Sequence, residues 1–254
     1  IVELVDEGAA SRARIVPGIG AQCASFTWTH GERELDVLVP PPDIEALRRD
    51  PVRFGNPILF PFPGRIKDGV FSFRGRRVVL PINDAVNQTA IHGLVLREAW
   101  RVVDHGADAA GAWVTCGLRT ADHPELERLF PFPYELRYTY RLREGRLESE
   151  IAVRNTGDGP LPMGLGLHPW FPLPLSANGS RGACTLRAPV SRIWELERLV
   201  PTGRILPAEP ARDLSQGVTL GDQEFDDVYT GLREGVDASG WSRSSYADPA
   251  AGAE

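Results

Sequence analysis

The sequence is poor in cysteine and methionine and contains no long apolar run. Its 254 residues include only 3 Cys and 1 Met. Cys23, Cys116 and Cys184 are widely and irregularly spaced, which argues against a disulfide framework or a zinc knuckle, so we expect small buried thiols. No apolar run approaches the roughly 18 to 20 residues of a membrane-spanning helix, and the N-terminal residues lack the pattern of a signal peptide. We therefore expect a soluble, cytoplasmic protein without a membrane partner.

The common nucleotide and metal motifs are also missing. The sequence has no G-x-x-x-x-G-K-[ST] loop, no G-x-S-x-G elbow and no H-E-x-x-H, which argues against the NTPase, elbow-hydrolase and zincin classes. Two G-x-G starts, at residues 18–20 and 164–166, lack the third glycine of a dinucleotide fingerprint. The 5 His are not closely spaced, and the net charge of -6 comes without a basic stripe. We expect neither a bound metal nor a nucleic-acid partner.

What the sequence does contain is a succession of short strands. Apolar and polar residues alternate over 136–143 and again over 147–153, on either side of a Glu-Gly turn. A period of two on both sides of a turn predicts an antiparallel pair with one buried face. A second hairpin is predicted from residues 70–73 and 77–82 around a central glycine. Further strands are expected at residues 22–28, 35–39, 100–105, 113–118, 184–188, 192–197 and 228–230.

Helix signals are few. Residues 43–49 begin with Asp, end with Arg and are followed by Pro51, and a second short turn is expected at 122–129. Many short strands at spacings of roughly 8 to 12 residues predict an all-β sandwich or barrel. Because no linker or internal repeat is visible, we expect a single domain over residues 1–254.

Two segments rich in proline and aromatic residues, 56–65 and 164–172, interrupt the strand pattern. Because each proline removes a ladder donor, neither is expected to be an ordinary central strand. His92 ends an apolar stretch before Gly93, and His168 is followed by a proline and Trp170. Each histidine is either a core residue bonded to a backbone carbonyl or a group that exchanges protons near neutral pH. The rigid backbone and the flat Trp170 ring favour the second role for His168, with a hydroxyl-rich ring as ligand.

Four further polar residues have two interpretations each. Arg65 is either an ordinary surface arginine or a fixed fork of donors for ligand oxygens. Asn83 is either a turn former or a hydrogen-bonding ligand group. Asp226 and Asp227 either start a strand, or one of them accepts protons from sugar hydroxyls.

Taken in order, these segments resemble the aldose 1-epimerase (galactose mutarotase-like) family. The resemblance extends over nearly the whole chain. The matching segments are specific when taken together, in their order and spacing, and no single segment is specific by itself. The matching stretches are residues 55–66, 68–75, 83–93 with Trp100, 130–136, 166–171 and 225–230. The resemblance implies a large antiparallel β-sandwich of the galactose mutarotase type, a free hexose as substrate and no redox cofactor.

The resemblance also implies roles for individual residues. His168 corresponds to the general acid that protonates the ring oxygen, and His92 to a second histidine near that oxygen. Arg65 and Asp226 correspond to hydroxyl anchors, and Trp170 to a platform for the sugar ring. The family's general base is a glutamate in a strand near the C-terminus, and Glu254 does not fit that motif. We therefore expect the chain to lack its last strands and the catalytic glutamate.

Two alternatives stay open at this point. A hexose 6-phosphate would be the substrate if basic groups such as Arg53 served the phosphate. The chain would instead be a non-catalytic carbohydrate-binding relative if the base were truly absent. In either case the expected partner is a small sugar, bound by a monomer or a homodimer.

Overall fold

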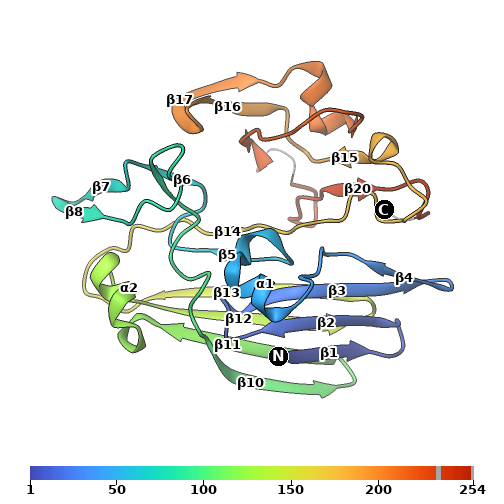
Figure 1. The fold of residues 1–254 in the computed structure, drawn as a ribbon, viewed down its shortest axis with the longest axis horizontal. Coiled ribbons are helices and arrows are strands. Elements are labelled where there is room, and N and C mark those ends of the chain that lie inside the picture. Colours follow the sequence, from blue (N-terminus) through green and yellow to red (C-terminus); the bar gives the residue numbers. More distant parts are fainter. Residues whose placement is uncertain (233–235, 253–254) are drawn as a thin grey trace. The chain divides into compact units, whose positions relative to one another are not determined.

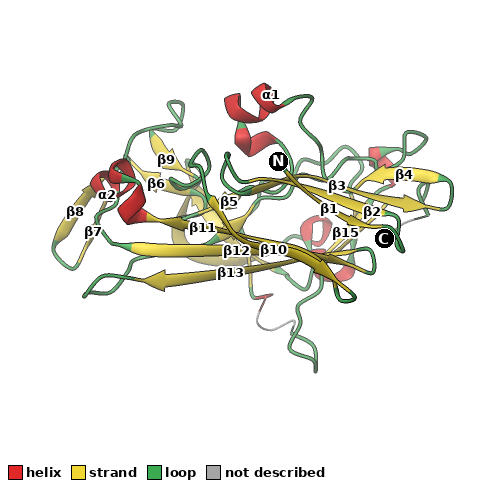
Figure 2. Cartoon of the chain, turned by 90° about the horizontal axis from the view of Figure 1, so that it is seen from below, coloured by secondary structure: helices red, strands yellow, loops and turns green. Residues whose placement is uncertain are grey.

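The computed structural model describes residues 1–232 and 236–252, and its regular secondary structure is almost all β-strand (Figures 1 and 2). The described chain forms two compact units, residues 1–172 and residues 173–254. The all-β prediction is confirmed, because the α-helices are only α1 (Ile44–Arg49) and α2 (Pro124–Leu129) within the described residues. No helix in these ranges is long and apolar enough to cross a membrane. The single domain over residues 1–254 stays a prediction.

Two four-stranded antiparallel sheets make up most of the first unit. One runs in the order β1 (Val2–Asp6), β2 (Ser11–Val16), β3 (Gln22–His30), β4 (Arg33–Asp36). The other runs in the order β10 (Arg101–Asp108), β11 (Gly111–Arg119), β12 (Tyr134–Arg143), β13 (Arg146–Asn155). One hydrophobic cluster joins Ile15 of β2 to Cys116 of β11 and Tyr138 of β12, and the Tyr140 hydroxyl donates to the Ala21 carbonyl at 3.0 Å. The two sheets therefore share one core.

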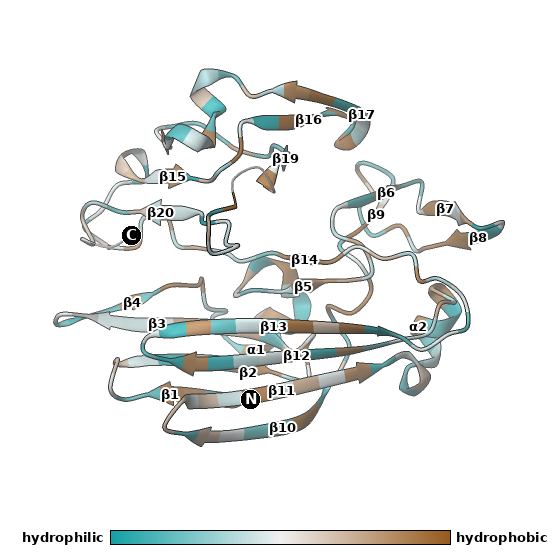
Figure 3. Cartoon of the chain, turned by 180° about the vertical axis from the view of Figure 1, so that it is seen from behind, coloured by the Kyte–Doolittle hydropathy of each residue, from teal (hydrophilic) through white to brown (hydrophobic). Residues whose placement is uncertain are grey.

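The predicted alternation is realised along β12. Tyr134, Leu136, Tyr138, Tyr140 and Leu142 are buried while the residues between them are more exposed, and hydropathy colours alternate along β12 and β13 (Figure 3). Burying several such side chains, at about 25 cal/mol per Å² of apolar surface, is the main force holding a sheet of this kind to its partner. The three cysteines are buried free thiols, as expected.

Shorter elements complete the first unit. They are β5 (Ile58–Leu59), β6 (Arg65–Lys67), β7 (Val70–Phe73), β8 (Arg76–Val79), β9 (Thr89–Ile91), β14 (Gly166–Leu167) and the 3-10 turns Pro51–Arg53 and Thr120–Asp122. β7 and β8 form the predicted hairpin. Helix α1 begins where Asp43 accepts a hydrogen bond from the Ala46 amide at 2.7 Å, which satisfies an otherwise free donor of the first turn.

The second unit contains two three-stranded sheets. Their orders are β18-β15-β20 and β17-β16-β19. The strands are β15 (Thr185–Arg187), β16 (Arg192–Glu197), β17 (Val200–Pro207), β18 (Val218–Thr219), β19 (Tyr229–Thr230) and β20 (Ser245–Ala247), with 3-10 turns at Arg181–Ala183, Pro210–Arg212 and Leu214–Gln216. A small cluster of Val190, Leu214 and Val218 forms its core.

Candidate functional site

The two proline and aromatic segments lie side by side in the first unit. They are joined by the two-residue strand pair β5 and β14, which is antiparallel. Beyond that pair, the His168 amide donates to the Pro57 carbonyl at 3.0 Å and the Trp170 amide donates to the Gly55 carbonyl at 2.9 Å. This backbone pairing fixes the positions from which the His168 and Trp170 side chains leave the chain.

His92 is held beside the same segment by a turn that follows β9. Its amide donates to the Gly64 carbonyl at 2.9 Å, and Gly93 forms a parallel bridge with Phe60. Both residues have left-handed backbone, with φ of 66° at His92 and 76° at Gly93, a region that histidine tolerates better than most side chains. A Cβ at Gly93 would lie 2.2 Å from the Phe60 oxygen, so only glycine fits there.

The three aromatic rings meet as a result. The His92 and His168 ring centroids are 5.2 Å apart at an interplanar angle of 64°, and the His168 and Trp170 centroids are 5.7 Å apart. Trp170 is 38% exposed, and its indole nitrogen donates to the Val52 carbonyl. The structure therefore brings together two histidines and one partly exposed aromatic face. His92 and His168 are 76 positions apart in the sequence.

The environment of the histidines sets which nitrogen is available. Nδ1 of His92 and Nδ1 of His168 are buried and have no hydrogen-bond partner among the described residues. Neither Nε2 atom belongs to that buried set, so the ε nitrogens are the ones open to a ligand. Burial, followed by the charges of His168 and Arg65, lowers the pKa of His92 to about 4. His92 is therefore neutral at pH 7.

Arg65 opens β6, which pairs with β9, so that Arg65 lies opposite Ile91 and next to the turn that carries His92. Its Nε donates to the Asp84 carboxylate at 3.1 Å, and its side chain is 23% exposed. Asp84 was not among the residues predicted for the site, although an Asp shortly after a predicted strand is a signal for side-chain bonding to a turn backbone.

Asn83 is engaged with the strand that leads to His92. Its side-chain Oδ1 accepts from the Ile91 amide at 2.7 Å, and its Nδ2 donates to the Ile91 carbonyl at 3.0 Å. Both ends of the amide thus bind backbone. This places Asn83 as a support for the end of β9, and its predicted contact with a ligand stays a prediction.

The remaining candidates are Asp226, Arg53 and Glu254. Asp226 belongs to the second unit, where it is exposed, and its neighbour Asp227 forms an ion pair with Arg212. Arg53 is also exposed, and its Nε lies 2.8 Å from the Asp50 carboxylate. Glu254 falls outside the described residues. Over residues 1–232 and 236–252, no group of three His, Cys, Asp or Glu side chains is arranged to hold a metal.

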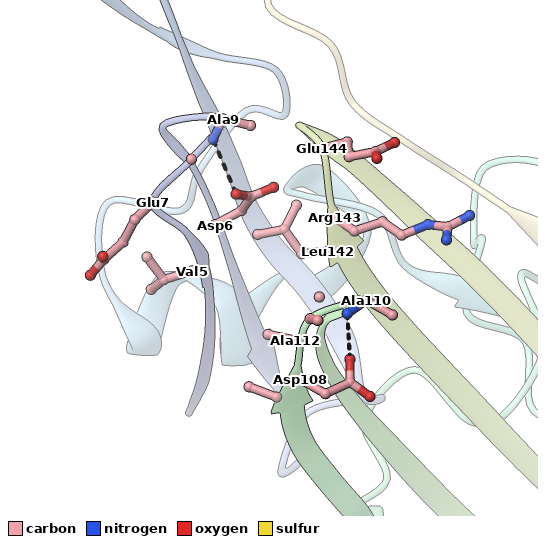
Figure 4. Close-up of a pocket in the computed structure, with 14 residues that line it drawn as sticks. Val5, Asp6, Glu7, Ala9, Asp108, Ala110, Ala112, Leu142, Arg143 and Glu144 are labelled. Atoms are coloured by element: carbon pink, nitrogen blue, oxygen red, sulfur yellow. Dashed lines mark hydrogen bonds between the residues drawn. The ribbon is translucent and has the colours of Figure 1, made fainter.

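A hollow of about 720 Å³ lies in the first unit among the turns that join β1 to β2, β10 to β11 and β12 to β13 (Figure 4). Two of its carboxylates, those of Asp6 and Asp108, accept hydrogen bonds from the turns themselves. Asp6 accepts from the Ala9 amide at 3.0 Å and from the Gly145 amide at 3.1 Å, and Asp108 accepts from the Ala110 amide at 2.7 Å. None of the candidate site residues lines this hollow. Turn formation accounts for the positions of Asp6 and Asp108 in it.

Comparisons with known proteins agree with this description. A family model described as aldose 1-epimerase matches residues 4–240. Two Escherichia coli K12 proteins, YihR and YphB, both described as uncharacterized, are 31% identical over 114 residues and 27% identical over 161 residues. The matches cover 45% and 58% of this chain, and 35% and 52% of those relatives. The chain therefore spans about half of their length or less.

Solved structures show the same fold. A galactose mutarotase-like protein from Clostridium acetobutylicum has a TM-score of 0.84 at 23% identity, and the match covers 96% of this chain and 73% of that one. Galactose 1-epimerase from Lactobacillus acidophilus NCFM has a TM-score of 0.69 at 17% identity, covering 88% and 64%. The predicted galactose mutarotase type of fold is confirmed.

Proposed function

The chain belongs to the aldose 1-epimerase family, and from that premise we propose that it interconverts the α and β anomers of a free hexose. The observation that supports the proposal most is the meeting of His92, His168 and Trp170 within one compact unit. A pair of imidazoles with open ε nitrogens beside an aromatic face suits a sugar ring, which has one apolar face and a polar edge.

Anomerisation needs two proton movements. A proton is delivered to the ring oxygen and another leaves the C1 hydroxyl, so that the bond between C1 and the ring oxygen breaks and an open-chain aldehyde forms. Rotation about the bond between C1 and C2, followed by closure on the other face of the aldehyde, returns both protons and inverts C1. We assign delivery of the ring-oxygen proton to Nε2 of His168 and removal of the C1 proton to the glutamate base that the family resemblance implies, to which no residue of this sequence is assigned.

The other residues bind and orient the sugar in this proposal. His92, whose pKa of about 4 keeps it neutral, places a second ε nitrogen near the ring oxygen without adding a charge that would oppose proton delivery by His168. The Arg65 guanidinium anchors a hydroxyl oxygen, and Trp170 packs against the apolar face of the ring. Asn83 is proposed as a further hydroxyl contact, and the predicted role of Asp226, which belongs to the second unit, stays a prediction.

A free hexose is favoured over a hexose 6-phosphate. Arg53, the residue that suggested a phosphate, already forms an ion pair with Asp50 at 2.8 Å. A phosphate would have to compete with that carboxylate, and like charges close together oppose binding.

The test is the approach to anomeric equilibrium of freshly dissolved α-D-galactose and α-D-glucose, followed by optical rotation. We expect acceleration over buffer by a protein that carries the glutamate implied by the family resemblance, and a loss of about 10²- to 10⁴-fold in His168→Gln, since a positioned acid is typically worth that much. His105→Gln is the matched control, because His105 is exposed on β10.

Three outcomes would count against the proposal. If a protein that carries the implied glutamate gives no acceleration with either sugar, it is not an epimerase of these hexoses. Binding of galactose by calorimetry without any acceleration would identify a carbohydrate-binding relative instead. If His168→Gln accelerates as well as the native chain, His168 is not the acid.

A further inference from the structure

A small turn between β8 and β9 is built around one carboxylate. Asp84 and Thr89 exchange two backbone hydrogen bonds of 3.1 Å each, which closes the turn at residues 84–89. Next to it, the side-chain amide of Asn83 forms hydrogen bonds with both the backbone N–H and the backbone carbonyl of Ile91, the residue that precedes His92. The turn therefore leads directly into the backbone that positions His92.

The Asp84 side chain collects donors from three residues. Its Oδ2 accepts from Asn87 Nδ2 at 2.9 Å, from Arg65 Nε at 3.1 Å and from Thr89 Oγ1 at 3.1 Å, and its Oδ1 accepts from the Asn87 amide at 3.2 Å. The side chain is 14% exposed. Donation from Asn87, and then from Arg65 and Thr89, lowers the pKa of Asp84 to about 2, so the carboxylate is ionised at neutral pH.

The hydrogen bond to Asp84 leaves part of the Arg65 guanidinium available for a ligand. The Asp84 carboxylate accepts only from Nε, the guanidinium nitrogen nearest the aliphatic part of the side chain. Within the described part of the chain, the terminal guanidinium nitrogens of Arg65 have no hydrogen-bond partner. A guanidinium has five donors in a rigid plane, so a single bond at Nε restrains the plane while leaving the terminal donors for a ligand. An arginine without this bond would lose that restraint and pay more rotamer entropy on binding.

We propose that Asp84 is a positioning residue, which fixes the Arg65 guanidinium side-on so that its terminal nitrogens face a sugar hydroxyl beside His92. This inference rests on the proposed function for the role of Arg65 as a hydroxyl anchor. It adds a residue that does not touch the sugar and whose loss acts through Arg65. Because the anchored hydroxyl is bound in both the ground state and the transition state, the effect falls on KM rather than on kcat.

The first experiment compares Asp84→Asn with Asn87→Ala in anomerisation kinetics. Asp84→Asn removes the charge that Arg65 binds, and a hydrogen bond to a charged group supports an increase in KM of about tenfold with kcat little changed. Asn87→Ala is the matched control, since it removes a partner of the same carboxylate in the same turn without touching Arg65. We expect its KM to stay within about twofold of the native value. Equal effects of the two variants would show a general role in the turn and overturn the proposal.

A double variant shows whether Asp84 acts through Arg65. In an Arg65→Lys background the Nε donor is gone, so adding Asp84→Asn is expected to change KM by less than about twofold. A further tenfold rise in the double variant would contradict the proposal. Thermal unfolding of each variant identifies any that has lost its fold.

The second experiment does not need activity. The Arg65 Nε proton, identified by its absence in Arg65→Lys, is expected to exchange with water at least about tenfold more slowly than that of Arg74, an exposed arginine. In Asp84→Asn this protection is expected to disappear. Persistent protection would overturn the positioning role even if the chain proves inactive. Lost protection without anomerase activity in the native chain would leave the positioning of Arg65 supported and the proposed function rejected.

Discussion

Lowering the pH from 7.5 to 5.0 is expected to destabilise the folded chain through His92. The pKa of His92 is lowered from 6.5 to about 4, first by burial and then by the charges of His168 and Arg65. Between these two values the unfolded chain binds a proton that the folded chain does not bind. Stability contributed by the neutral ring is therefore fully present above pH 6.5 and is lost as the pH falls toward 4.

The size of the effect follows from the same two pKa values. At pH 5.0 the full shift corresponds to about 2 kcal/mol of the free energy of unfolding. The His92 ring is only partly buried, and solvent screening reduces the expected value to about 1 kcal/mol. Carboxylates such as Asp84, whose pKa is about 2, do not contribute in this range because they stay ionised.

The assay is urea unfolding at pH 7.5, 6.0 and 5.0 of the native chain and of His92→Asn. Asparagine tolerates the left-handed backbone at this position and does not titrate, so the variant is expected to lose about 1 kcal/mol less than the native chain over the interval. His105→Asn, at an exposed position on β10, serves as the control and is expected to follow the native chain. An identical pH dependence of His92→Asn and the native chain would refute the reasoning.

Two further substitutions test the packing that holds the site. Gly93→Ala is expected to lower the free energy of unfolding by more than about 2 kcal/mol, because its Cβ would lie 2.2 Å from the Phe60 oxygen. Gly75→Ala is the control, since Gly75 has a similar φ of 79° and open space around it, and it should lower that free energy by only about 1 kcal/mol. Equal losses in the two variants would contradict the clash. Tyr140→Phe is expected to cost about 1 kcal/mol, since its buried hydroxyl donates to a backbone carbonyl. Tyr134→Phe is expected to be neutral within about 0.5 kcal/mol, because that buried hydroxyl has no partner among the described residues, and urea midpoints decide both comparisons.

The larger strands were predictable because their burial is local. Alternation over residues 136–143 predicted β12 directly, and the capping Asp43 predicted the start of α1. β17 was missed because Pro201 and Gly203 read as strand breakers. It lies at the edge of its sheet, where a missing amide donor is tolerated.

The candidate site could be predicted only in part. The apolar surroundings of His92 and the proline after His168 marked both residues, but their meeting depends on the pairing of β5 with β14, and two residues on each strand give no periodic signal. The role of Asn83 as a support for Ile91, and of Asp84 as the partner of Arg65, depends on long-range register that no local pattern contains. Their discovery required the fold.

The most direct test of the account is the response of the histidine nitrogens to sugar. The chain labelled with ¹⁵N-histidine is titrated with D-galactose, and the Nε2 signals of His92 and His168 are followed, with His105 as internal control. Both Nε2 signals are expected to shift in a saturable way while the His105 signals stay constant. Saturable binding that leaves both Nε2 signals unmoved would contradict the claim that these two imidazoles face the sugar.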